Sequence, residues 1–434
     1  MQKLLELQTK VLYSWLFNQT DISTAFRRYA KLLGILLFII LAGTLYQFGD
    51  MTTIDAIPAE GYKNSTHPLA YFYRALPSSI LIPGILIGIG LSIALYFGWY
   101  PFWIILYQLL LHTRTMLEFE TFFSFQWDIL LIEVLFFSLL FISPKLKRIK
   151  KDSIIQVYTI QLLPFIFLFI RLFYHSGKVK LLSKDYLWLS YTALPTHLFS
   201  QPMPHIFSFL AHKYLVIKKG LGPFMLQIMF LIELAVPFGL LLRSYRAISA
   251  SILILLQVLI ILTGNYGFFN YLTIVGLLFI AYLPSSPTVP DRPKKATAIG
   301  IYTIAVLLTI NAVYRIPIPT IQLPIAPQFF HSMQLYNTYG LFAKLTKNQT
   351  RYNVAVSNNN IDWTPLQTRF FTDSGYPSLV IVQPYHPRIR WQLWFKFIHT
   401  ERYPMWYRTF IKELAKDPNS LSTIIKPKAS LNKG

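Results

Sequence analysis

Apolar runs of membrane-spanning character recur along most of the chain, and they constrain its fold more than any other feature. Hydrophobic residues make up 54% of the 434 residues and charged residues 13%, about half the charged share that is usual in soluble domains. So little charge would not cover the surface of a soluble protein of this length. The 16% of aromatic residues suits repeated membrane interfaces, where Trp and Tyr collect. The sequence therefore predicts a polytopic α-helical membrane protein.

Nine of these runs are close to the length that a bilayer requires, so we expect about nine membrane segments. They lie at Leu32–Phe48, Ile80–Phe97, Trp99–Leu111, 128–142, Ile154–Tyr174, Gly222–Leu242, Ala247–Leu262, Gly267–Leu283 and Thr297–Tyr314. The shorter segments can also be tilted or re-entrant. Residues 1–31 come before them and carry apolar side chains at helical spacing in a polar background. This pattern predicts an N-terminal interfacial helix.

The net charge of +22 comes mainly from short basic clusters between the apolar runs. The chain has no RNA-binding aromatic motif and no long basic arm, so the expected partner is the lipid bilayer and not nucleic acid. The first cluster, Arg27, Arg28 and Lys31, lies at the N-terminus. If this end is cytoplasmic, three further basic clusters also fall on the inner side, as the positive-inside rule requires. These are KLKRIKK at 145–151, Arg243 with Arg246, and DRPKK at 291–295.

The same topology leaves three stretches on the outer side: Gly49–Ser79, a large outer loop at 175–221, and the tail at 315–434. The tail loses the long apolar runs and gains Pro, Asn and charge. In it, TRYNVAVS and LVIVQPY are typical of strands, whereas IRWQLWFKFI and WYRTFIKELA are typical of helices. We therefore predict a transmembrane helical domain at 32–314, followed by a C-terminal α+β extramembrane domain on the periplasmic or lumenal side.

Motifs for chemistry are missing from the sequence. The chain has no cysteine, which excludes disulfides, thiol catalysis and cysteine-bound metal. It also has no paired carboxylates at catalytic spacing, no HxxxH metal motif, no nucleophile elbow and no phosphate-binding loop. We therefore predict no catalytic residue, no metal and no cofactor.

Polar residues that are costly in lipid gather in three stretches that this topology brings to the outer side. FQWD, at the start of the fourth segment, contains Gln126, Trp127 and Asp128. The outer loop adds His175, Lys178, Asp185, Trp188 and Gln201, and the turn TGNYGFFN adds Asn265, Tyr266 and Asn270. Together these residues predict a polar vestibule on the outer face.

Each stretch also has a purely structural interpretation. The loop can be an interfacial helix with snorkelling lysines, and the Asn265 corner can be an ordinary turn. Asp128 can simply pair with Lys178, which would satisfy both charges. Glu233, inside the sixth segment, is expected to face the bundle and to pair with Arg171 or another polar group.

Several stretches, taken together, resemble the lipase maturation factor family. In the membrane part they are SGKVKLLSKDYLWLSYTALPTHLFSQPMP, FQWD, IELAVPF and TGNYGFFNYLTI; in the tail they are YNTYGLF, RYNVAVS and QPYHPRIRWQLWF. The resemblance covers about residues 10–425, and its most specific parts are TGNYGFFNYLTI and QPYHPRIRWQLWF. The N-terminal third matches loosely, and the chain departs from the family in its short C-terminus and its lack of cysteine.

The resemblance implies a membrane-embedded factor that assists the folding or assembly of secreted client proteins such as lipases. It adds Gly177 to the vestibule, and it marks a tail motif as a candidate client-binding surface. This motif comprises Tyr385, His386, Pro387, Arg388, Trp391 and Trp394. Arginine and tryptophan dominate binding hot spots. Trp391 and Trp394, at i and i+3, can equally belong to the core of the tail or to its contact with the membrane.

Two other functions remain open. A distant fold-level similarity to the vitamin K-dependent carboxylases implies an enzyme that acts in the outer polar vestibule, with Lys178, or the neighbourhood of His175 and Asp185, as its base. A transporter is the third alternative, but the sequence lacks the paired interrupted helices that would support it. We expect the endoplasmic reticulum membrane for a eukaryotic protein and the inner membrane for a bacterial one. The compact, cysteine-free chain, rich in Lys, Asn and Ile, favours a bacterial member.

Overall fold

A computed structural model describes most of the predicted membrane part and about half of the tail. The described residues are 18–54 and 67–285, except positions 75, 124, 202 and 204, and then 333–345, 354–366, 369, 381–398 and 403–426, except positions 336 and 358. Most residues of the predicted N-terminal interfacial helix and the whole predicted ninth segment, Thr297–Tyr314, lie outside these ranges.

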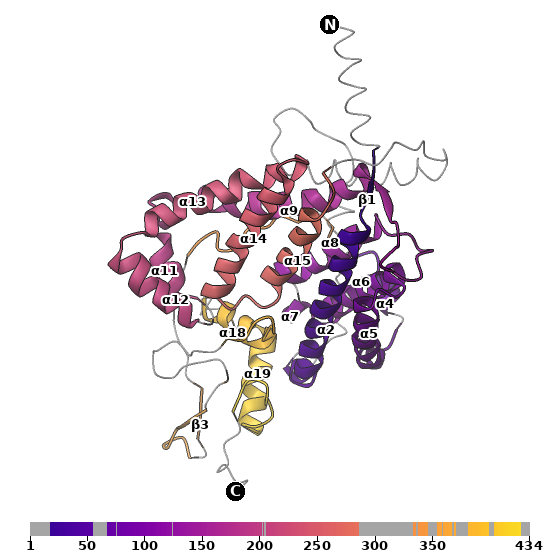
Figure 1. Cartoon of the computed structure of the whole chain (residues 1–434). Helices are drawn as coiled ribbons and strands as arrows, with labels where there is room; N and C mark the ends of the chain where they lie inside the picture. The colour runs from indigo at the N-terminus through magenta and orange to yellow at the C-terminus, as the bar shows by residue number, and fades with distance from the viewer. Residues whose placement is uncertain are drawn as a thin grey trace.

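Five helical stretches among the described residues are long and apolar enough to cross a membrane. They are α2 (Ser23–Ile54), the turn η1 (Ser78–Ile80) with α5 (Leu81–Tyr96), α9 (Thr159–Leu182), α13 (Gly222–Leu234) with the 3₁₀ turn η3 (Val236–Leu241), and α14 (Arg246–Thr263). Each coincides with one of the nine predicted segments. Figure 1 shows them packed into one helical bundle.

Three more predicted segments are helical but shorter or more polar. They are α6 (Pro101–Glu118), α8 (Gln126–Leu139) and α15 (Phe269–Ala281). At 1.5 Å per residue, the 14 residues of α8 and the 13 of α15 reach only about 20 Å, less than the hydrocarbon thickness of a bilayer. The last two turns of α6 carry His112, Arg114 and Glu118, all buried. The described residues therefore contain five candidate membrane spans, and the count of about nine is not confirmed.

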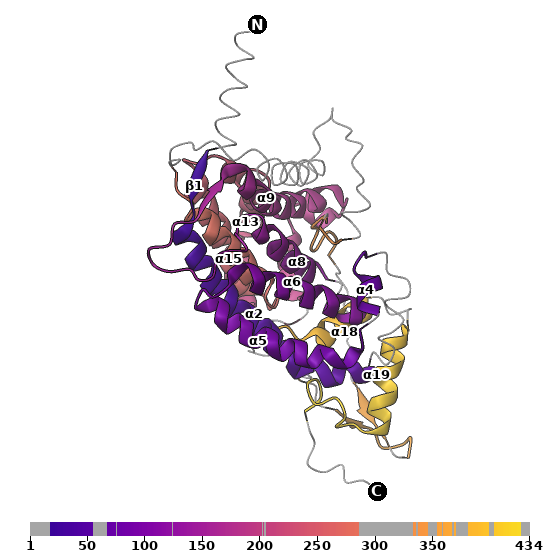
Figure 2. The ribbon, with the colours of Figure 1, turned by 90° about the vertical axis from the view of Figure 1, so that its right-hand side faces the viewer.

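Small residues bring α2, α5 and α6 close together. A Cβ on Gly34 of α2 would collide with the Ser92 carbonyl of α5, and one on Gly88 would collide with leucine side chains of α2 and α6. The carbonyls of two glycines in α5 accept hydrogen bonds from α6: Tyr107 donates to Gly84 O at 2.8 Å, and Gln108 donates to Gly88 O at 2.8 Å. Close packing of this kind drives helix association in membranes. Figure 2 shows α2 and α5 side by side.

One end of the bundle collects the basic clusters. A short antiparallel pair marks this end, made by β1 (Gln19–Asp21) and β2 (Gln156–Tyr158). Arg27 donates to the Lys151 carbonyl at 3.2 Å, and Arg243 donates to the Thr159 hydroxyl at 2.9 Å, so three clusters that are distant in sequence meet here. DRPKK lies outside the described residues.

The opposite end carries the tail. Its described elements are the two-residue strands β3 (Ala355–Val356) and β4 (Thr364–Pro365), which pair antiparallel, and the helices α18 (Arg388–Ile398) and α19 (Met405–Lys416). Both predicted tail helices are therefore present. Of the predicted strand LVIVQPY, the described residues Ile381 to Tyr385 are not in a strand. Figures 1 and 2 place α18 and α19 at the end away from β1.

The tail helices share a core with the bundle. One cluster of buried residues joins Leu41 of α2 and Ile85 of α5 to Ile389, Trp406 and Phe410 of the tail. Two short helices complete this region, α4 (Ala70–Arg74) and α7 (Glu120–Phe123). A separate α+β domain is not confirmed, and its boundaries stay a prediction.

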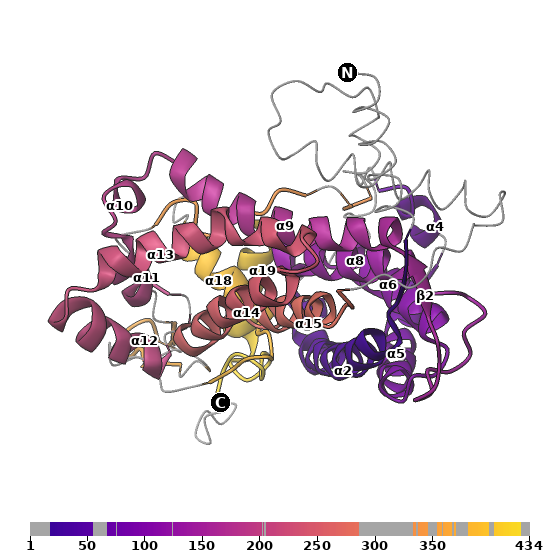
Figure 3. The same cartoon turned by 45° about the horizontal axis from the view of Figure 1, so that its top comes forward.

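The loop predicted at 175–221 begins later than expected. Helix α9 continues to Leu182, so His175, Gly177 and Lys178 are helical. At Gly177 the missing side chain lets α9 pack directly against Glu233 and Leu234 of α13. Figure 3 shows α9 and α13 side by side. The remaining stretch forms short helical elements. They are α10 (Tyr186–Leu189), α11 (Ala193–Phe199), α12 (Ile206–Leu210) and the π-helical turn η2 (Ala211–Lys218).

Because the basic end and the tail end lie at opposite ends of the bundle, we predict that they face opposite sides of the membrane. The chain has no cysteine, so single cysteines can be placed at two exposed positions, Lys147→Cys in the basic turn and Lys412→Cys on α19. In sealed inverted vesicles, a membrane-impermeant maleimide should label the first at once and the second only after detergent is added. Labelling of both from one side would contradict a bundle that crosses the bilayer between them.

Candidate functional site at the junction of bundle and tail

A buried ion pair joins the tail to the bundle. Arg388, at the start of α18, is 2% exposed, and Asp128, in the first turn of α8, is 5% exposed. The guanidinium meets the carboxylate with two hydrogen bonds of 2.8 and 3.0 Å and donates a third, of 2.9 Å, to the Phe122 carbonyl. It also lies 3.4 Å from the Phe123 ring centroid. The expected pairing of Asp128 with Lys178 is wrong, because a residue 260 positions away occupies the carboxylate.

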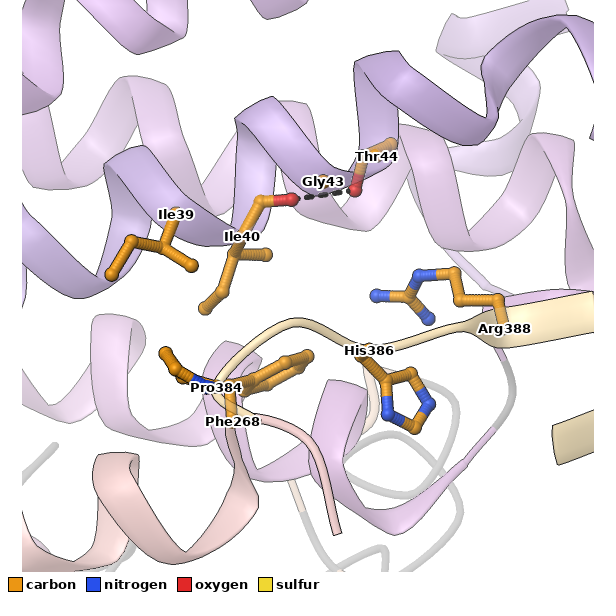
Figure 4. A pocket seen from close by; sticks show the side chains of 8 residues that line it. All are labelled: Ile39, Ile40, Gly43, Thr44, Phe268, Pro384, His386 and Arg388. Carbon is orange, nitrogen blue, oxygen red and sulfur yellow. Dashed lines mark hydrogen bonds between the residues drawn. The ribbon is translucent and has the colours of Figure 1, made fainter. Parts of the chain in front are cut away.

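Helix α2 holds the same motif from the other side. Gln47 donates to the His386 carbonyl at 2.9 Å and accepts from the Arg388 amide at 2.8 Å, so one side chain satisfies two backbone groups of the tail. Near the end of α2, Asp50 accepts from the Thr423 amide at 2.9 Å. Figure 4 shows the Arg388 side chain directed toward the turn of α2 that carries Thr44, whereas the His386 ring lies on the other side of its backbone, away from α2. The space left between α2 and this motif is about 10 Å³, room for about one water.

His386 explains a glycine in the turn TGNYGFFN. Its ring packs against Trp127, with centroids 4.4 Å apart, and against Trp391 at 5.8 Å. Gly267 has φ +60°, and a Cβ there would overlap the imidazole. Burial, and secondarily the charge of Arg388, lower the pKa of His386 well below its usual range. The ring is therefore neutral at physiological pH and serves as a packing element.

The amides of this turn are hydrogen-bonded within the protein. Asn265 donates to the Met203 carbonyl at 3.2 Å and accepts from the Val382 amide at 3.0 Å. Asn270 donates to Gln257 at 2.6 Å. Asn265 thus ties the turn to the tail and to the loop segment after α11, while Asn270 links α15 to α14.

A second tail segment, 337–345, runs along the bundle and was missed by reasoning from side-chain chemistry. Gln126 accepts from the Gly340 amide at 3.1 Å, and Asp185 accepts from the Leu345 amide at 2.8 Å. Trp188 donates to the Phe342 carbonyl at 3.1 Å. The motif YNTYGLF, which contributed only to the family resemblance, is the signal that marks this segment.

Among the described residues, two further buried ion pairs connect different helices of the bundle. Arg171 of α9 meets Glu133 of α8 at 2.5 Å, and Glu133 also accepts from the Tyr339 hydroxyl of the tail. Glu233 is buried as expected, but its partner is Lys180 of α9, at 2.6 Å, and not Arg171. Buried pairs are tolerated when both charges are hydrogen-bonded, and here they connect neighbouring helices.

A cavity of about 330 Å³ opens beside the tail motif. Its walls are mainly aromatic, with Trp127, Tyr266, Phe342, Trp391, Trp394 and Phe395 contributed by three separate parts of the chain. The Tyr266 hydroxyl lies 3.2 Å from His197 Nε2. Burial, and then the charge of Lys180, lower the pKa of His197 to about 4. The His197 ring, which lines the cavity, is therefore uncharged at neutral pH.

The structure brings some of the predicted site residues together and separates others. Trp127, Gln201, Tyr266, Trp391 and Trp394 line the cavity. Asp128, His386, Pro387 and Arg388 lie behind it, packed between α2, α7 and α8. The tail motif is thus an internal contact and not an open client-binding surface. His175, Gly177 and Lys178 belong to the α9 face, and none of them lines the cavity.

The buried pair predicts a large stability effect. Arg388→Ala leaves a buried unpaired carboxylate, so we expect a loss of about 3–5 kcal/mol in the free energy of unfolding. The double variant Asp128→Leu with Arg388→Met should lose less than the two single variants added together. Chemical unfolding in detergent would measure both. Glu413→Gln, which breaks the exposed pair with Lys416, is the control and should change stability by less than about 1 kcal/mol.

Gly267 predicts a second, smaller effect with a matched control. Gly267→Ala combines positive φ with overlap on His386, so we expect a loss of about 1–3 kcal/mol. Gly49→Ala, in a helical turn of α2 where a Cβ meets nothing within 4 Å, should be neutral or stabilise by about 0.5–1 kcal/mol. Equal behaviour of the two variants in thermal unfolding would contradict the packing described here.

Comparison with known proteins places the chain in a family. Residues 65–284 match the family described as the lipase maturation factor transmembrane domain, and residues 335–433 match the lipase maturation factor C-terminal domain. With its five apolar helices, the chain is an integral membrane protein. No solved structure matches it.

Individual relatives carry the same name. Lipase maturation factor 1 of Mus musculus is 26% identical over 346 residues, which cover 70% of this chain and 58% of that protein. Lipase maturation factor 2 of Homo sapiens is 37% identical over 191 residues, which cover 41% of this chain and 27% of that protein. The chain thus spans less than two thirds of the relatives that it matches. The two domain matches together cover most of the chain, and the chain belongs to the lipase maturation factor family.

Proposed function

We propose that this protein is a membrane-embedded maturation factor that assists the folding or assembly of secreted client proteins, lipases among them. Family membership and the names of the relatives support the role. The observation that carries the proposal is the way the tail is held. A buried ion pair, Asn265 and Gln47 fix it on one end of the bundle, so the tail presents its outer side as a rigid surface at the membrane.

The charge distribution supports an outward-facing tail. The basic clusters meet at the β1–β2 end, which the positive-inside rule assigns to the cytoplasm. The tail then lies on the periplasmic or lumenal side, where secreted proteins fold. In a bacterium the membrane would be the inner membrane, and in a eukaryote the endoplasmic reticulum membrane.

Exposed apolar side chains of the tail are the best candidates for client contact. Between β3 and β4, Ile361 is 79% exposed and Trp363 is 59% exposed. Large apolar side chains in such positions mark interaction sites when they cluster, and tryptophan is enriched among binding hot spots. This hairpin replaces the motif at 385–394 as the proposed client-binding surface, because that motif is internal.

The described geometry does not support the enzyme alternative. That hypothesis places Lys178 as a base in a shared polar vestibule. Asp128 is bound to Arg388, and Asn265 is bound to backbone groups. Lys178 lies in α9 and has no ion-pair partner among the described residues. A catalytic base needs to share a substrate pocket with other polar groups. The contacts of Asp128 and Asn265 do not place either side chain in a common pocket with Lys178.

Co-expression with a secreted lipase would test the proposal. Trp363→Ala should lower the specific activity of the secreted lipase several-fold, because it removes an exposed contact, while the amount of the factor in the membrane stays constant. Trp103→Ala is the matched control: Trp103 is 54% exposed but lies at the basic end, where it donates to the Pro144 carbonyl. We expect no effect from it.

The enzyme alternative makes the opposite forecast for one variant. Lys178→Ala should leave lipase maturation unchanged if the protein acts by contact. If Lys178→Ala abolished maturation while the factor remained folded and abundant, the proposal would fail and a catalytic base would be the better explanation.

A further inference from the structure

The cavity beside the tail motif has no part in the client contact proposed above. It measures about 330 Å³, within the range of small-molecule sites and roughly twice the size of an apolar cavity that holds benzene. Its lining comes from α8, from α11 and the residues that follow it, from the turn before α15 with the first residue of that helix, and from the tail. Such a space would normally be filled by side chains, because protein interiors are close-packed.

Buried polar groups in the lining lack a hydrogen-bond partner among the described residues: the indole N–H groups of Trp127, Trp391 and Trp394, and the whole amide of Gln201. Gln201 is 4% exposed, and neither its amide nitrogen nor its amide oxygen has a hydrogen-bond partner among the described residues. An unsatisfied buried amide is destabilising, so the site is more stable when something bonds to it. An amide offers both a donor and an acceptor, which a hydroxyl or an ester next to a hydroxyl can satisfy together.

The rest of the lining selects against charge. The walls are aromatic, and His197 is neutral at physiological pH. Lys344, the charged residue among the described lining residues, is exposed to solvent. A carboxylate or phosphate placed at Gln201 would lack a buried counter-charge, and burying an unpaired ion is costly. An apolar chain, by contrast, suits the faces of Trp391 and Trp394.

We propose that the cavity binds a single-chain lipid with an uncharged, hydroxyl-bearing head, of the monoacylglycerol type. The head bonds to the Gln201 amide, and the acyl chain packs against the tryptophans. The bilayer that surrounds the protein supplies amphiphiles of this size. Since the cavity lies between bundle and tail, an occupied cavity also fills the junction that holds the tail in place.

Tryptophan fluorescence gives a direct test, because three tryptophans line the cavity. The full chain would be placed in phosphatidylcholine nanodiscs and titrated with a monoacylglycerol that carries bromine on its acyl chain, since bromine quenches tryptophan on contact. Wild type should show a saturable component. Ala343→Phe, which fills the cavity, should abolish that component, and the matched variant Ala247→Phe, on the exposed side of α14, should keep it.

The role of Gln201 is tested by changing both protein and probe. Gln201→Leu should weaken binding of the brominated monoacylglycerol about tenfold, the usual effect of one lost hydrogen bond, and should leave binding of a brominated alkane unchanged. Gln156→Leu, at an exposed position of β2, is the matched control and should change neither. Because Gln201→Leu removes an unsatisfied amide, its thermal stability without the probe should equal or exceed that of wild type, which shows that the variant folds.

Two results would overturn the proposal. Quenching that is non-saturable, or equal in wild type and Ala343→Phe, would mean that the probe reaches the tryptophans only from the bilayer. Tighter binding of a brominated fatty acid at pH 8 than of the monoacylglycerol would mean that the site prefers an anion. Neither result bears on client maturation, so this inference and the proposed function can fail separately.

Discussion

The buried pair of Asp128 and Arg388 is the interaction on which the junction between bundle and tail depends. A carboxylate and a guanidinium can leave water only if each finds the other and the remaining donors are satisfied. Both conditions hold here, through two bonds to Asp128 and one to the Phe122 carbonyl. Because either charge alone would be strongly unfavourable, the start of α18 has one well-defined position against α8. Gln47 then fixes the backbone of the motif in the same place.

The polar groups of this protein serve mainly as connectors between elements that are distant in sequence. Asn265 joins a membrane turn to the tail, Gln126 joins α8 to segment 337–345, and Glu233 joins α13 to α9. In a low-dielectric bundle, an unpaired polar group is costly, so each of these bonds specifies one neighbour. The Gln201 amide has no such neighbour among the described residues, and the cavity that it lines is the part of the junction that a ligand can complete.

Reasoning from residues located the right stretches but often the wrong partners. The stretches around Asp128, Asn265 and Arg388 do meet, and Trp391 belongs to the core, as one of the two interpretations allowed. The partner of Asp128 was wrong because side-chain chemistry gives a list of possible cations and no distances. The end of α9 was placed too early for a related reason: a loop beginning at 175 is the simple interpretation of a polar stretch, whereas Gly177 packs against α13 and Lys180 pairs with Glu233 in a buried helix.

The sequence by itself determined that the chain is a helical membrane protein, where its five longest apolar helices lie, and which family it resembles. These properties follow from local composition and periodicity, which need no knowledge of the neighbours. Only the tertiary structure decided that the YHPRIRW stretch is internal, that segment 337–345 runs along the bundle, and that aromatic residues from three separate parts of the chain enclose a cavity. These features depend on contacts between residues more than 100 positions apart, and such contacts leave no periodic signal in a single sequence.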